Sequence, residues 1–153
     1  MRISELCSLT KECVDLSDFV IKINGKGSKE RLIQICNRNV QSLMQKYYLL
    51  YQNEITEKDY IFINRFGNRL SSQSVRNMIK KCAFEADISL HITPHMFRHS
   101  FATLLLEEDV DIRYIQQMLG HSSITTTQIY THTSTNKQKS ILATKHPRNK
   151  FDI

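Results

Sequence analysis

Hydrophobic residues recur at the spacing of one helix face in several stretches of the chain. Two such stretches predict helices at 38–52 and 72–86, the second with a start signal in the serine-rich segment 71–74. Thr93 as the N-cap and Pro94 as the first helical residue predict a third helix from 94 to about 107. A fourth is expected from 109 to 119 and ends at Gly120.

Shorter elements are expected elsewhere. Residues 3–9 are consistent with the remainder of a helix, Ser122 or Ser123 is suited to cap a helix that includes Tyr130, and 137–143 predicts one more short helix. The β-prone runs 19–23 and 31–35 flank the glycine-containing segment 24–30, which predicts a β-hairpin. The run 60–63 is either a strand or an extended segment. The predicted fold class is therefore α+β, mostly helical, with a small antiparallel sheet.

Length and composition agree with one globular domain. The chain has 153 residues, 41% of them apolar, with only four glycines and two prolines, and it shows no internal repeat or linker. No apolar run approaches the ~18 residues of a membrane helix, and residues 1–5 lack the apolar stretch of a signal peptide. The four scattered cysteines form no C-x-x-C pair. We therefore expect a cytoplasmic location, no disulfide framework and no bound metal.

Positive charge is unevenly distributed along the chain. Twenty-one Lys and Arg against fifteen Asp and Glu give a formal charge of +6, and no acidic residue occurs from 112 to 151. This pattern suggests an anionic partner, although a solvated basic surface would also explain it. The basic residues that we consider as contacts to an anionic partner are Lys22, Lys29, Arg31, Arg113, Lys137 and Lys139.

The segment 93–103 contains the most informative polar residues. His95 and Arg98 lie three positions apart, and therefore share a face in the first turns of the predicted helix. Free backbone N–H groups there favour an anion, and Arg98 can bind a phosphate in bidentate fashion. The alternative is an ordinary surface His and Arg. Apolar neighbours on the same helix are assigned to the core, namely Phe97, Phe101, Leu104 and Leu105.

Five motifs in order resemble those of the tyrosine recombinases, the family of phage integrases and of recombinases that resolve chromosome dimers. The motifs are Arg2-Ile3-Ser4-Glu5-Leu6, Gly25-Lys26-Gly27-Ser28-Lys29-Glu30-Arg31, Pro94-His95-Met96-Phe97-Arg98-His99, Leu119-Gly120-His121-Ser122, and Tyr130 where the nucleophile is expected. The resemblance covers nearly the whole chain.

This resemblance implies a set of catalytic roles. Tyr130 would attack a DNA phosphodiester and form a 3′-phosphotyrosyl intermediate. Arg2, Arg98 and His121 would bind the phosphate oxygens, Lys26 would protonate the leaving 5′-oxygen, and His95 would assist proton transfer with Tyr130. Elementary chemistry agrees, because fixed arginine donors stabilise the charge of a phosphodiester transition state. The covalent phosphotyrosyl intermediate also conserves the energy of the phosphodiester bond, so no cofactor is expected.

The resemblance also implies partners and limits. Double-stranded DNA would be the substrate, and the protein would act as a homo-oligomer, a tetramer on DNA, whose C-terminal segment contacts a neighbouring protomer through Ile141, Leu142 and Ala143. The family's catalytic domain has helices before its first arginine and a separate N-terminal domain, so residues 1–153 are expected to be a truncated C-terminal catalytic domain. The alternatives are a catalytically impaired DNA-binding remnant of the same fold and, more distantly, a type IB topoisomerase-like enzyme.

Overall fold

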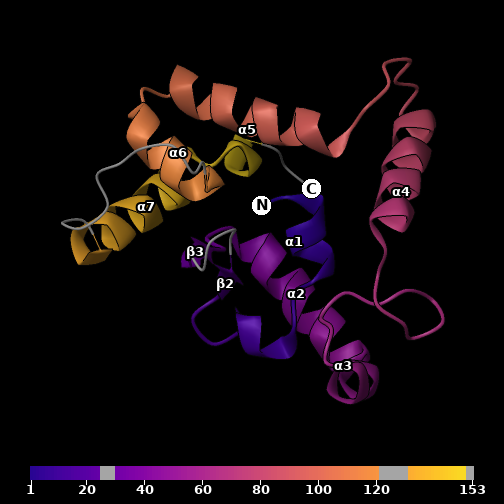
Figure 1. Cartoon of the computed structure of the whole chain (residues 1–153). Helices are drawn as coiled ribbons and strands as arrows, with labels where there is room; N and C mark the ends of the chain where they lie inside the picture. The colour runs from indigo at the N-terminus through magenta and orange to yellow at the C-terminus, as the bar shows by residue number, and fades with distance from the viewer. Residues whose placement is uncertain (25–29, 121–130, 151–153) are drawn as a thin grey trace.

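The computed structural model describes residues 1–24, 30–120 and 131–150, without the side chains of residues 131–137 and 150. Over these ranges the chain is mostly helical with one small antiparallel sheet (Figure 1), which confirms the predicted fold class. The α-helices are α1 (Ile3–Cys7), α2 (Arg38–Leu50), α3 (Gln52–Lys58), α4 (Ser72–Glu85), α5 (Pro94–Glu107), α6 (Ile112–Leu119) and α7 (Thr131–Lys145). Two short 3-10 helices are η1 (Lys11–Cys13) and η2 (Pro147–Lys150).

The sheet has the strand order β1–β2–β3, formed by Val14–Asp15, Val20–Asn24 and Glu30–Gln34. Strands β2 and β3 pair antiparallel from Val20 opposite Gln34 to Asn24 opposite Glu30, so the predicted hairpin is confirmed within one residue. The two-residue strand β1 has too short a pattern to be predicted from the sequence. The hairpin turn, 25–29, lies outside the described residues.

One hydrophobic core lies between the sheet and helices α2 and α3. Its buried members are Leu9, Ile21, Ile23, Ile55 and Ile61. The sequence predicts a single helix over 38–52, but the backbone leaves helical geometry at Tyr51 (φ −115°, ψ 23°) and α3 begins at Gln52. The change of direction brings Ile55 into this core with no exposed surface, which explains the break.

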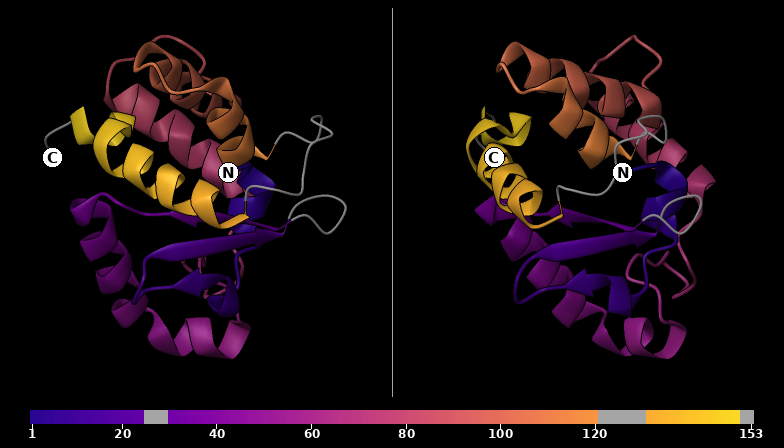
Figure 2. Two further views of the ribbon diagram at one scale, coloured as in Figure 1. Left: turned by 90° about the vertical axis from the view of Figure 1, so that its left-hand side faces the viewer. Right: turned by 60° about the vertical axis from the view of Figure 1, so that its left-hand side comes forward.

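A second core joins α5, α6 and α7 and consists of Leu105, Val110, Ile115, Met118, Leu119, Ile141 and Leu142. Helix α7 lies between the sheet and the pair α5–α6 (Figure 2). It is much longer than the predicted helix at 137–143. Ile141 and Leu142 are buried inside this protomer, so the expectation that they pack against a neighbouring one is wrong; Ala143 is exposed.

Local capping signals place most helix ends where the sequence predicts them. Ser71 and Thr93 accept hydrogen bonds from the backbone N–H groups of Ser74 and Met96, and Gly120 ends α6 in the left-handed conformation (φ 68°). Helix α6 begins at Ile112 rather than Asp109. Asp109 itself has a positive φ of 57°, which turns the chain so that Val110 enters the second core.

The prediction for the apolar residues of α5 is only partly correct. Leu105 is fully buried and Phe101 packs against the same core, whereas the Phe97 side chain is 59% exposed. Phe97 lies one turn before Phe101, and among the described residues it is not one of those that pack against the second core. In the described ranges, none of the helices is both long and apolar enough for a membrane span.

Candidate active site

Arg2 is held by contacts to α1 and to the end of α6. It is the N-cap of α1, and its backbone N–H and its Nη1 donate to the two carboxylate oxygens of Glu5, at 2.5 and 2.9 Å. This is the reciprocal arrangement of a helix start, with the acidic side chain at the third helical position. The Nη2 of Arg2 donates to the Gly120 carbonyl at the end of α6, at 3.2 Å. Arg2 therefore connects α1 to a helix 118 residues away.

Arg31 approaches the same carboxylate from the sheet. Residues alternate between the two faces of β3, and Arg31 lies on the inner face with Ile33 while Glu30 and Leu32 are exposed. Its Nη1 and Nη2 bind Glu5 Oε1 and Oε2 at 3.2 and 2.7 Å, a bidentate pair. The two side chains are only 12% and 11% exposed. Arg31 is therefore turned inward, unlike an exposed phosphate contact.

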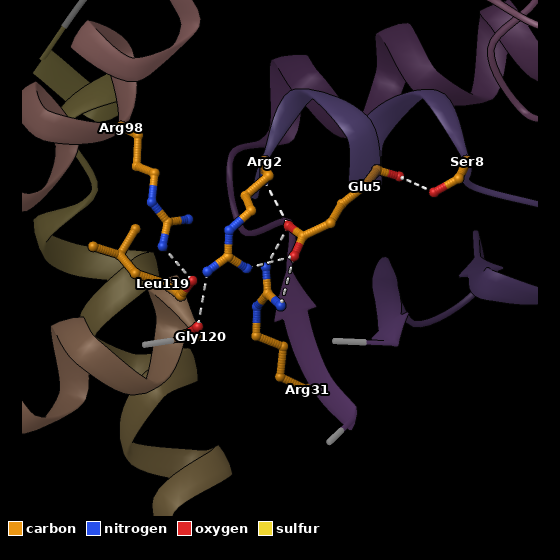
Figure 3. Close-up of polar contacts among 7 residues, drawn as sticks. All are labelled: Arg2, Glu5, Ser8, Arg31, Arg98, Leu119 and Gly120. Atoms are coloured by element: carbon orange, nitrogen blue, oxygen red, sulfur yellow. Dashed lines mark hydrogen bonds and ion pairs between the residues drawn. The ribbon is translucent and has the colours of Figure 1, made fainter. Parts of the chain in front are cut away.

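Arg98 comes from α5, on the opposite side of the cluster (Figure 3). It lies two turns before the buried Leu105, so the helix face that packs on α6 also directs Arg98 toward the end of α6. Its Nη2 donates to the Leu119 carbonyl, and Arg2 contacts the next carbonyl, that of Gly120. Two arginines from distant parts of the chain thus meet at consecutive carbonyls directly before His121.

Gly120 is required at this point for two reasons. Its φ of 68° is the left-handed conformation that side chains disfavour. A Cβ at this position would lie 2.8 Å from Nη1 and 3.0 Å from Cζ of Arg31, closer than such atoms approach. The absence of a side chain lets α6 close onto the Arg31 guanidinium and brings the Leu119 and Gly120 carbonyls within reach of the other two arginines.

The cluster has an excess of positive charge. Three guanidinium groups surround one carboxylate, so two charges are uncompensated within the cluster. Burial tends to raise the pKa of Glu5, but hydrogen bonds from Arg31 and Arg2 outweigh it and lower the pKa to about 2. Burial, together with the charges of Arg2 and Arg31, lowers the pKa of Arg98. Each effect identifies the cluster as a place where an anion would be stabilised.

An unpaired donor indicates where that anion would bind. Nη1 of Arg98 is buried and has no hydrogen-bond partner among the described residues. A buried N–H group without an acceptor costs free energy that an oxygen ligand would recover. In the same described ranges no group of three or more His, Cys, Asp or Glu side chains could hold a metal ion.

The other predicted catalytic residues are only partly described. His95 is exposed in the first turn of α5, one turn before Arg98. Lys26, His121 and Tyr130, and with Tyr130 the helix expected to contain it, lie outside the described residues. Of the six predicted site residues, the structure brings Arg2 and Arg98 together.

The predicted DNA contacts have varied surroundings. Lys22 is exposed and pairs with Glu30 across the hairpin at 2.8 Å, and this ion pair raises the pKa of Lys22. Arg113 is exposed at the start of α6 and pairs with Asp111 at 2.6 Å, while Lys139 is exposed on α7. Lys29 and the side chain of Lys137 lie outside the described part of the chain.

Sequence reasoning missed two residues of this cluster and misjudged a third. Glu5 belongs to the motif that begins at Arg2. Its position three residues after Arg2 could have predicted their ion pair, because side chains at this spacing meet on a helix. The Leu119 carbonyl and the Arg31–Glu5 pair gave no signal, because they join segments 21 and 26 residues apart.

Comparison with known proteins decides the family. The family model described as "Phage integrase family" matches residues 1–137. The chain belongs to the phage integrase family. All the described residues of the arginine cluster fall inside the matched region.

Named relatives of this phage integrase chain are recombinases. It is 58% identical over 151 residues to a "Tyrosine recombinase" of Agathobacter rectalis, covering 99% of this chain and 49% of the relative. It is 40% identical to a "Tyrosine recombinase XerD" of Halalkalibacterium halodurans, covering 97% of this chain and 50% of the relative. The chain thus spans about half the length of these curated relatives.

Solved structures give the same fold. The XerA recombinase crystal structure superposes with a TM-score of 0.73 at 34% identity, covering 91% of this chain and 52% of that one. The XerH site-specific recombinase bound to palindromic difH substrate, a post-cleavage complex, gives a TM-score of 0.70 at 28% identity and covers 94% of this chain and 42% of that one. The phage integrase chain is therefore similar in sequence and fold to the XerA recombinase and to the XerH recombinase bound to its difH substrate.

Proposed function

We propose that residues 1–153 form the C-terminal catalytic domain of a site-specific tyrosine recombinase, which cleaves and rejoins double-stranded DNA by transesterification. The observation that supports this most strongly is the meeting of Arg2 and Arg98 at consecutive carbonyls at the end of α6. These arginines are 96 positions apart in the sequence, yet they occupy one basic site directly before His121. The names of the relatives agree with this activity.

In the proposed reaction the arginines bind the scissile phosphate. Charge accumulates on the non-bridging oxygens as the phosphorus is attacked, and preorganised guanidinium donors stabilise it. Nη1 of Arg98 is the buried donor available for one of these oxygens. The Arg2 side chain is 45% exposed, so its guanidinium can face both Glu5 and a ligand. His121, next to Gly120 in the chain, would add a further donor.

The covalent step balances without a cofactor. The Tyr130 phenol oxygen attacks phosphorus while the bond to the 5′-oxygen breaks, which leaves a 3′-phosphotyrosyl link. The phenol proton passes to His95, and Lys26 protonates the departing 5′-oxygen. A 5′-hydroxyl of the partner strand then attacks the phosphorus of the phosphotyrosyl link and gives its proton to Lys26, while Tyr130 departs and takes its proton back from His95. The reverse step therefore rejoins DNA with no net change in bond type.

The proposed DNA contacts outside the site are the other basic residues that the sequence suggested. Lys22, Lys29, Arg113, Lys137 and Lys139 would bind phosphates of double-stranded DNA, with contributions that weaken as salt rises. The tetramer on DNA remains part of the proposal, but its contacts must involve residues other than Ile141 and Leu142, which are buried within the protomer.

Covalent trapping tests this function. The protein is incubated with a library of nicked duplexes of random sequence, in which cleavage near the nick releases a short fragment and prevents rejoining. We expect DNA that stays attached to the protein through detergent denaturation, and no such product from Tyr130→Phe, which lacks the nucleophilic oxygen.

Controls separate the alternatives. Lys58→Gln alters an exposed residue of α3 far from the cluster and should give as much adduct as the unaltered protein. If the unaltered protein and Tyr130→Phe bind DNA equally well and neither forms a covalent adduct, the protein is a catalytically impaired DNA-binding remnant. An adduct that survives in Tyr130→Phe would mean that another residue is the nucleophile.

A further inference from the structure

Arg31 was expected to contact DNA, but its surroundings indicate a different role. Both terminal nitrogens of its guanidinium bind Glu5, and the same carboxylate binds the side chain and backbone of Arg2. The guanidinium also lies against Gly120, with no room for a single extra carbon. Arg31 therefore contacts both groups that hold Arg2, namely Glu5 and the residue that provides its carbonyl acceptor (Figure 3).

The geometry points to Arg31 as a positioning residue that fixes the Arg2 guanidinium through Glu5. This inference rests on the proposed function, since it assigns Arg31 a part in the same reaction. Arg31 does not touch the phosphate in this assignment. It acts because the Glu5 carboxylate, held from two directions, can present its oxygens to Arg2 in one orientation only.

The position of Arg31 in the hairpin adds a second consequence. Asn24 and Glu30 are paired and bound the segment 25–29, which contains Lys26, and Arg31 follows immediately. The Arg31–Glu5 pair therefore fastens strand β3, close to the turn end of the hairpin, to α1, which begins next to Arg2.

Single-turnover cleavage of a trapped DNA sequence separates positioning from DNA contact. In Arg31→Gln we expect the cleavage rate at saturating DNA to fall by about 10²-fold, the loss that a displacement of about 1 Å produces in an active site. DNA affinity should change by less than about twofold, because the side chain is turned inward. Lower affinity with an unchanged saturating rate would instead identify Arg31 as a surface phosphate contact and overturn the inference.

The conservative variant tests whether charge alone suffices. Arg31→Lys keeps the positive charge but cannot form the bidentate pair, so we expect it to recover only part of the rate. Full recovery by lysine would show that the field of the charge matters and not the fixed geometry. Thermal unfolding is measured for each variant. If Arg31→Gln does not fold, the cleavage rate of Arg31→Lys still tests the positioning role.

A double-variant cycle tests whether Arg31 acts through Glu5. If it does, Glu5→Gln combined with Arg31→Gln should be no slower than the slower single variant, because both changes remove the same linkage. Independent roles would multiply the two losses, and that result would contradict the inference. Lys58→Gln is the control, because it alters an exposed residue of α3 away from the cluster.

A sulfur leaving group separates Arg2 from Lys26 as the target of Arg31. A thiolate departs without a proton, so a defect in Lys26 placement disappears when the 5′-bridging oxygen is replaced by sulfur. We expect the Arg31→Gln defect to persist on the sulfur substrate, because the phosphate clamp is still displaced. Full rescue by sulfur would contradict the assignment to Arg2.

One readout does not depend on cleavage and keeps the two proposals distinguishable. In ¹⁵N-labelled protein we expect Arg31→Gln to shift the Arg2 Nε–H resonance and to speed its exchange with water. An unchanged Arg2 signal would overturn the inference even if the enzyme is active. If unaltered protein forms no covalent adduct but Arg2 responds, the proposed function fails while the positioning by Arg31 stands.

Discussion

Arg31 and Gly120 illustrate how single residues set the geometry of the cluster. The Arg31 guanidinium occupies the space that any side chain at position 120 would need, and the same guanidinium neutralises Glu5. The glycine of the Leu119-Gly120-His121 motif is therefore explained by a contact with a residue 89 positions earlier as well as by its positive φ. A motif that is read as chemistry in the sequence proves to be partly a packing requirement.

Gly120→Ala tests this requirement. The left-handed backbone costs a residue with a Cβ about 1–2 kcal/mol, and displacement of Arg31 adds to this loss. We expect urea unfolding to show a destabilisation of about that size or more. Gly120→Ala should destabilise the Arg31→Ala variant less than it destabilises the unaltered protein, since the clash with the Arg31 side chain is removed. If Gly120→Ala costs the same free energy in both proteins, the contact between Arg31 and position 120 is contradicted.

The low pKa of Glu5 predicts a pH dependence of stability. The carboxyl has a pKa of about 2 in the folded protein and 4.5 as an ordinary glutamate. Between these two pH values the Glu5 carboxyl is protonated in the unfolded chain but ionised in the folded one. The contribution of Glu5 to the free energy of unfolding is therefore fully present above about pH 4.5 and is lost as pH falls toward 2. Unfolding free energies measured over this interval should depend less steeply on pH in Glu5→Gln. Equal slopes would contradict the ion-pair account.

At the scale of elements, local signals in the sequence were sufficient for most helices and insufficient for their packing. Ser71, Thr93 and Gly120 predicted helix ends because capping involves neighbours in sequence. The end of α2 at Tyr51, the strand β1 and the exposure of Phe97 depend on contacts with distant segments. In the candidate site, the resemblance to the tyrosine recombinases suggested Arg2 and Arg98, whereas the role of Glu5 and Arg31 required the position of α1 against β3.

Helix α5 provides a matched pair that tests the packing. Leu105→Ala should cost about 2–5 kcal/mol, because the side chain is fully buried between α6 and α7. Phe97→Ala should cost less than about 0.5 kcal/mol, because the ring is mostly exposed. Chemical denaturation of the two variants measures both values. Equal losses would show that Phe97 is part of the core after all.

At the scale of the whole molecule, the arginine cluster lies where two parts of the fold meet. Arg2, Glu5 and Arg31 belong to α1 and the sheet, which pack on the core of α2 and α3, whereas Arg98 and Gly120 belong to the helical layer α5–α6. Figures 1 and 2 show α7 closing the space between the sheet and this layer. The complete set of donors therefore forms only when both parts dock, which couples folding to site assembly.

If the arginine cluster binds the scissile DNA phosphate for attack by Tyr130, as we propose, the chemistry of a trapped adduct shows it most directly. After digestion of the covalent complex with nuclease and protease, mass spectrometry identifies the modified residue and the DNA end attached to it. We predict a nucleotide linked through its 3′-phosphate to Tyr130, and a strongly reduced yield in Arg98→Gln. A link to another residue, or through a 5′-phosphate, would contradict the account.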